Sequence, residues 1–128
     1  FIRNEESNTY YNIECNCVGT LLIGLRGDDY GRCHMESEVM AEVKRWASLG
    51  REPFGERDEQ TAWELALVIP VNTFAKYPLH LEEGARLRAN IYKCGDDLPV
   101  PHFVSWNPIN TEKPNFHRPD CFGELLLG

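Results

Sequence analysis

Strict alternation of polar and apolar residues marks the first clear element of the chain. One face of this segment carries Tyr10, Asn12, Glu14 and Asn16, and the other carries Thr9, Tyr11, Ile13, Cys15 and Cys17. A period of two is typical of a β-strand with one buried face and one solvated face. The apolar run from Thr20 to Arg26 follows after Val18-Gly19, and this short connection predicts a hairpin. The polar run from Arg26 to Gly31 indicates a loop.

Further strands are predicted along the rest of the chain. They run from Thr61 to Pro70, from Ala85 to Cys94, from His102 to Trp106 and from Phe122 to Leu127. The segment from Met35 to Leu49 fits either a helix or a strand, and Asn72 to Lys76 fits a single helical turn. Short strands between Gly- and Pro-containing turns predict an all-β fold. We expect an antiparallel two-sheet β-sandwich of the jelly-roll type with short helical turns.

The length of 128 residues fits a single domain. The chain opens with Phe1-Ile2 and passes directly into a polar turn, whereas a strand normally has about five or six residues. We therefore expect residues 1–128 to be one domain that lacks its amino-terminal strands. Free strand edges in such a domain favour self-association.

The charge balance argues against one large class of partners. The net charge is −7, with 20 acidic and 13 basic residues, and nucleic acid binding depends on Lys and Arg side chains that neutralise phosphates. Neutral and cationic ligands remain open. No apolar run approaches the roughly 20 residues that a membrane-spanning helix needs.

The cysteines and histidines form no metal-binding pattern. The residues are Cys15, Cys17, Cys33, Cys94 and Cys121, with His34, His80, His102 and His117. Without a C-x-x-C or H-x-x-x-H pair, we expect buried, inert thiols and structural histidines. The turns at Asp28-Asp29 and Asp96-Asp97 offer carboxylates to calcium, but they lack the spacing of an EF-hand loop, which favours plain surface turns.

Two predicted strands carry polar faces whose chemistry suits a sugar. One face holds Tyr10, Asn12, Glu14 and Asn16, and the other holds Arg86, Arg88, Asn90 and Tyr92. Amides, carboxylates and guanidinium groups offer fixed donors and acceptors to neighbouring hydroxyls. If the strands lie together, the two faces form one polar floor. The alternative is a solvated outer face with Glu14 paired to an arginine on the neighbouring strand.

Aromatic side chains next to polar groups can stack on the C–H face of a sugar ring. Trp106 is the best candidate, because it stands at a strand end before the polar loop that begins at Asn107. Trp63 belongs to an apolar strand and is expected in the core, whereas Trp46 fits either the core or a ligand contact.

Catalysis has little support in the sequence. The chain has no G-x-S-x-G elbow, P-loop or Gly-rich dinucleotide turn. A glycan hydrolase using Glu14 and Glu64 is one alternative, since glycoside hydrolysis needs a pair of carboxylates. A haem-binding electron-transfer sandwich using Met35 or Met40 with a histidine is another.

Four stretches of the chain resemble motifs of the family 9-like carbohydrate-binding domains. Their Y-Y-N-F-E-F-N…G-T strand pair is similar to Tyr10-Tyr11-Asn12-Ile13-Glu14-Cys15-Asn16 with Gly19-Thr20. Their W…I-P segment is similar to Trp63-Glu64-Leu65 with Ile69-Pro70. Their R-x-N-F-Y-R strand is similar to Arg88-Ala89-Asn90-Ile91-Tyr92-Lys93. The end of the chain is similar to their H-F-x-S-W-x-P…F-H-R-P-x-x-F-G close, at Pro101-His102-Phe103-Val104-Ser105-Trp106-Asn107-Pro108, Asn115-Phe116-His117-Arg118-Pro119 and Phe122-Gly123. The matches run from Tyr10 to the end, and the last is the most specific.

This resemblance implies a two-sheet sandwich that binds an oligosaccharide or polysaccharide without catalysis. It also implies a secreted, bacterial protein of polysaccharide utilisation, in an extracellular, periplasmic or cell-surface location. Members hold a sugar between two Trp side chains, and some carry structural calcium. On matching positions, the implied ligand contacts are Trp106, Asn107, Arg88, Asn90, Glu14 and Asn12, with His117 and Arg118 as loop contacts. The second Trp would come from a region upstream of Phe1.

Overall fold

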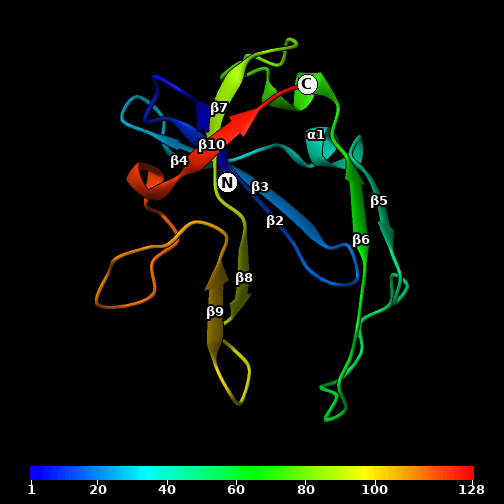
Figure 1. Cartoon of the computed structure of the whole chain (residues 1–128). Helices are drawn as coiled ribbons and strands as arrows, with labels where there is room; N and C mark the ends of the chain where they lie inside the picture. Colours follow the sequence, from blue (N-terminus) through cyan, green and yellow to red (C-terminus); the bar gives the residue numbers. More distant parts are fainter.

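Six short strands form the main sheet of the protein, described for residues 1–128 by a computed structural model (Figure 1). The sheet has the order β10-β7-β1-β2-β3-β4. Its strands are β1 (Ile2–Asn4), β2 (Tyr10–Cys15), β3 (Leu21–Gly27), β4 (Gly31–His34), β7 (Arg86–Ala89) and β10 (Gly123–Leu126). Two smaller sheets pair β5 (Lys44–Ala47) with β6 (Leu65–Val68), and β8 (Tyr92–Gly95) with β9 (His102–Ser105). The helical turns are α1 (Ser37–Ala41), η1 (Val71–Phe74) and η2 (Pro119–Cys121).

All strand pairs are antiparallel, which confirms the predicted all-β sandwich and the β2–β3 hairpin. The ambiguous segment from Met35 to Leu49 contains both alternatives, the short helix α1 and the strand β5. Two predictions were wrong. The run from Arg26 to Gly31 is a tight turn between β3 and β4, and the predicted strand from Ala85 to Cys94 is two strands in different sheets.

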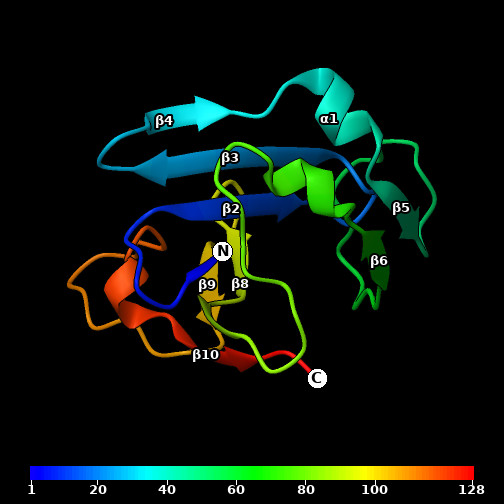
Figure 2. The same ribbon diagram turned by 90° about the horizontal axis from the view of Figure 1, so that it is seen from above.

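The core lies between one face of the main sheet and a layer made of β5–β6, α1 and η1. Figure 2 shows the green segment around η1 crossing β2 and β3, with α1 beside β3. The buried side chains of this core are Tyr11, Ile23, Leu25, Met35, Val43, Phe74 and Leu79. Tyr11 also accepts a hydrogen bond from the Tyr77 amide at 2.9 Å, so its hydroxyl is satisfied inside the core.

The opposite face of the main sheet carries the β8–β9 hairpin and the loop that follows it, as the downward projection of the hairpin in Figure 1 shows. β4 and β10 are the edge strands of the main sheet. The prediction of self-association through free edges stays a prediction. None of the helices is long and apolar enough to cross a membrane.

Candidate functional site

The face of the main sheet that points away from the core is polar. Cross-strand pairing sets its side chains in three rows across β2, β3 and β4. The rows are Tyr10 with Arg26 and Arg32, Asn12 with Gly24 and His34, and Glu14 with Leu22. We call these residues the polar face. Tyr10 and Asn12 are buried, whereas Glu14, Arg32 and His34 are exposed, so the polar groups of this face are accessible to a ligand.

A glycine on the central strand fixes the geometry around Glu14. The Asn12 side chain lies across Gly24, where an added Cβ would stand 2.5 Å from Asn12 Oδ1. Asn12 Nδ2 donates a hydrogen bond of 2.7 Å to Glu14 Oε1. Because Asn12 is itself held in place by burial, it orients the exposed carboxylate of Glu14 and keeps it ready to accept hydrogen bonds.

His117 brings the carboxy-terminal loop onto the polar face. Its Nδ1 lies 2.9 Å from the Tyr10 hydroxyl, and its ring stacks on Phe1 at a centroid distance of 5.1 Å. Burial lowers the pKa of His117, Arg26 and Arg32 lower it further, and Glu14 opposes them. The imidazole is therefore neutral at pH 7 and lies within electrostatic reach of both arginines and of Glu14.

This shift predicts a pH dependence of stability. The pKa of His117 is lower in the folded state than in the unfolded chain, so the unfolded chain takes up the proton first as the pH falls below 6.5. The free energy of unfolding therefore decreases as the pH falls from 6.5 to the pKa of the folded state, and this loss is complete below it. We expect the melting temperature of the His117→Gln variant to fall less than that of the wild type between pH 7 and pH 5. Burial also lowers the pKa of the Phe1 amino group, to about 6, so the difference between the two proteins is the informative quantity. Parallel melting curves would contradict the role of His117.

The β8–β9 hairpin has an inner side directed at the polar face. Its pairing places Tyr92, Cys94 and Phe103 on that side. Tyr92 stacks on Phe116 at 4.3 Å and meets Phe1 edge-on at 5.0 Å. Burial raises the pKa of the Cys94 thiol, and the carboxylates of Asp96 and Glu14 add to the increase.

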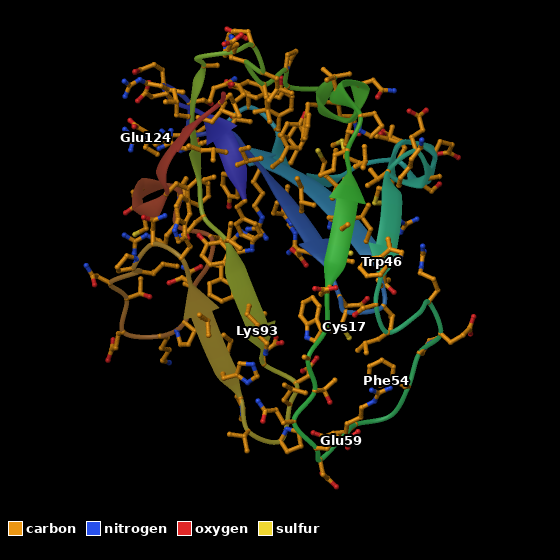
Figure 3. The ribbon with its side chains drawn as sticks, turned by 45° about the vertical axis from the view of Figure 1, so that its right-hand side comes forward. Cys17, Trp46, Phe54, Glu59, Lys93 and Glu124 are labelled. Carbon is orange, nitrogen blue, oxygen red and sulfur yellow. The ribbon has the colours of Figure 1, made fainter.

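Trp106 lies on the other side of the same hairpin. The Trp106 amide donates to the Ile91 carbonyl at 2.9 Å, which extends the β8–β9 pairing by one residue. Alternation then places Trp106 and Ile91 on the same side of the hairpin as Lys93 and Val104. We call this the outer side of the hairpin, and Figure 3 labels Lys93 on β8. The indole is 55% exposed. Trp106 therefore lies on the side of the hairpin opposite to Tyr92 and Phe103.

Asn90 is sealed in the interior, contrary to its predicted contact with a ligand. It is fully buried, its Nδ2 donates to the carbonyls of Asn107 and Cys121, and its Oδ1 accepts from the amides of Ile91 and Asn107. These bonds take the place of strand pairing at the junction of β7 and β8. The Asn107 side chain packs across Gly123, where an added Cβ would stand 2.3 Å from Asn107 Nδ2, and this Nδ2 is buried without a hydrogen-bond partner.

The two predicted arginine contacts are engaged within the protein. Arg88 does lie on the same sheet face as Glu14, but β1 separates β7 from β2, so the predicted single polar floor is interrupted. Arg88 Nη2 pairs with Glu5 Oε1 at 3.3 Å, and Arg118 Nε donates to Asp120 at 2.9 Å.

Of the eight predicted contacts, the structure places Asn12 and Glu14 on the polar face and His117 against its Tyr10 end. Sequence reasoning missed Arg26, Arg32 and His34. The residues on both sides of the turn from Gly27 to Gly31 alternate as in two paired strands, and this alternation could have indicated Arg26, Arg32 and His34. It was missed because the run from Arg26 to Gly31 was interpreted as a loop.

Several alternative sites do not form. Nowhere do three His, Cys, Asp or Glu side chains converge on a metal position. Of the two methionines considered for a haem, Met35 is buried in the core and Met40 is half-buried and packs against that core. Glu64 precedes β6, which packs on the sheet face opposite to Glu14, so these carboxylates do not flank one bond.

The exposure of other side chains also differs from expectation. Trp63 is 41% exposed and Trp46 is 55% exposed, so neither is a core residue. None of the cysteine thiols is paired; four are half-buried and Cys94 is exposed, so the expected full burial is wrong.

Comparison with known proteins gives a consistent result. The model of carbohydrate-binding family 9 matches residues 1–127. The crystal structure of a "putative carbohydrate-binding protein" from Bacteroides uniformis ATCC 8492 is similar, with a TM-score of 0.91 and 45% sequence identity. The match covers 99% of this chain and 58% of that protein, so the chain spans little more than half of its length. No curated protein matches the chain.

Proposed function

Because the chain belongs to carbohydrate-binding family 9, we propose that it is a non-catalytic module that binds sugars of plant-type or related polysaccharides on the polar face. The observation that carries the proposal is the exposed Glu14 carboxylate, held by a hydrogen bond from the buried Asn12 amide. A fixed carboxylate accepts hydrogen bonds from two neighbouring hydroxyls, and this arrangement is common in sugar recognition. His34 lies in the same row as Asn12, two strands away and beyond Gly24, and its ring nitrogens offer further polar contacts.

The inner side of the β8–β9 hairpin offers the apolar surface that a sugar ring needs. Phe103 lies there, is 40% exposed and meets Phe116 edge-on at 6.1 Å. A cavity of about 310 Å³ opens between β9 and residues 109–116, and both rings line it. We therefore assign the stacking role to Phe103 in place of Trp106, whose indole is on the outer side.

The family and the Bacteroides relative support a secreted or surface-associated role in polysaccharide utilisation. We propose an extracellular, periplasmic or cell-surface location on that basis. The chain would then hold a glycan near other proteins that degrade or import it, and modest affinity suffices for such a task.

Calorimetric titration with xylose, cellobiose, xylo-oligosaccharides and galactose tests the proposal. We expect binding of at least one sugar in the micromolar to millimolar range, a loss of tenfold or more in Phe103→Ala, and little change in Trp106→Ala. The two variants are matched controls, because each removes one half-exposed ring from an opposite side of the same hairpin. If Trp106→Ala abolishes binding and Phe103→Ala does not, the assigned face is wrong.

A further inference from the structure

Two arginines face each other on the polar face without a carboxylate between them. Arg26 on β3 and Arg32 on β4 are direct cross-strand partners, and neither belongs to any ion pair of the protein. Like charges in this position destabilise a sheet. The arrangement is also unexpected in a chain of net charge −7, in which acidic partners are abundant.

The neighbouring arginines of the same sheet face are all satisfied. Arg3 donates to the carbonyls of Glu5, Ser7 and Pro119, Arg88 pairs with Glu5, and Arg86 pairs with Glu124 at 2.8 Å. The uncompensated charge is therefore confined to Arg26 and Arg32, which lie at the open β4 edge of the sheet.

The field at this position is positive. After burial, the charges of Arg26 and Arg32 are the groups that lower the pKa of His117, and the opposing effect of Glu14 does not cancel them. Glu14 lies four residues further along β2 from the Tyr10–Arg26–Arg32 row, about 13 Å at the rise of a strand. Asp28 and Asp29, in the adjoining turn, form an ion pair with neither arginine.

We propose that Arg26 and Arg32 bind the carboxylate of a hexuronic acid residue in the glycan that occupies the polar face. Guanidinium groups match the planar geometry of a carboxylate through paired hydrogen bonds, and two of them around one anion remove their mutual repulsion. The distance from Glu14 allows one end of the ligand to present hydroxyls to Glu14 and the other end to present its acid group to the arginines. This inference rests on the proposed sugar-binding function and assigns its ligand class.

The test compares oligogalacturonate and glucurono-xylo-oligosaccharide with the same oligosaccharides after their carboxyl groups have been reduced to alcohols. Titrations at about 20 mM and 300 mM salt should show at least tenfold tighter binding of the acidic forms by the wild type, with the preference shrinking at high salt. In the double variant Arg26→Gln with Arg32→Gln, the preference should disappear. The matched control is Lys44→Gln with Arg57→Gln, which removes the same charge from exposed positions outside the main sheet and should keep the preference.

The outcomes separate this inference from the function on which it rests. Binding of neutral and acidic forms with equal affinity overturns the uronate assignment and leaves the sugar site standing. Tighter binding of a κ-carrageenan oligosaccharide, which carries sulfate but no uronic acid, than of the uronates overturns the carboxylate class. No binding of any sugar removes the proposed function together with the inference. If the double variant is unfolded, the exposed Arg32→Gln alone must still reduce the preference at least threefold.

Discussion

Replacing Asn90 with alanine is expected to lower the free energy of unfolding by about 3–5 kcal/mol, the largest effect of any single polar substitution in this chain. The substitution leaves two buried amides and two carbonyls at the β7–β8 junction without their partner, and each unsatisfied group costs about 1–3 kcal/mol, partly recovered by relaxation. For a domain of this size, the melting temperature should fall by about 10 °C or more. Urea unfolding and calorimetry measure both quantities.

Asn110→Ala is the matched control, because Asn110 is exposed in the loop after Asn107, and we expect it to change stability by less than about 0.5 kcal/mol. Asn90→Asp adds a second comparison, since it keeps the acceptor but turns a carboxylate oxygen toward the carbonyls of Asn107 and Cys121. Equal stability of Asn90→Ala and Asn110→Ala would show that the buried amide does not hold the junction together.

Replacing Glu14 with glutamine is expected to weaken sugar binding by a factor of about 10–100. Hydrogen bonds to a charged acceptor contribute about 1.5–3 kcal/mol each, and every 1.4 kcal/mol is a factor of ten in affinity. Glutamine retains the shape of the side chain but removes its charge and replaces one acceptor with a donor. Because Glu14 is exposed and forms no ion pair, the melting temperature should stay within about 2 °C of the wild type.

Glu64→Gln provides the control, since Glu64 is exposed and associated with the opposite face of the main sheet. It should bind sugar as the wild type does. Unchanged affinity in Glu14→Gln, measured by calorimetry against the sugar that the wild type binds best, would be inconsistent with the polar face as the site.

Much of the fold follows from local pattern. The alternation from Tyr10 to Cys15 predicts β2 and its exposed Glu14. The same pattern predicts Tyr10 and Asn12 as solvated, but both are buried, because the chain packs on both sides of this part of the strand. The break between Ala89 and Tyr92 has no such signal. It depends on Asn90, whose side chain bonds to Asn107 and Cys121, 17 and 31 residues away, and contacts that distant are invisible to periodicity.

The site was predicted less completely, for two physical reasons. Gly27-Asp28-Asp29-Tyr30-Gly31 has the composition of a long loop, yet it closes a tight turn, so the alternation of Arg26, Arg32 and His34 on its two sides was hidden. For Trp106, the position at a strand end before a polar loop agrees with its exposed ring. The side of the hairpin on which the ring lies depends on tertiary packing around Phe116 and Tyr92, which the sequence does not reveal.

A crystal structure of the chain soaked with its best-binding sugar tests the central claim most directly. We predict that the ring lies on the inner side of the β8–β9 hairpin, with two hydroxyl oxygens within about 3.2 Å of the Glu14 carboxylate and its C–H face against Phe103. A sugar ring stacked on Trp106, with Glu14 facing only water, would contradict this account.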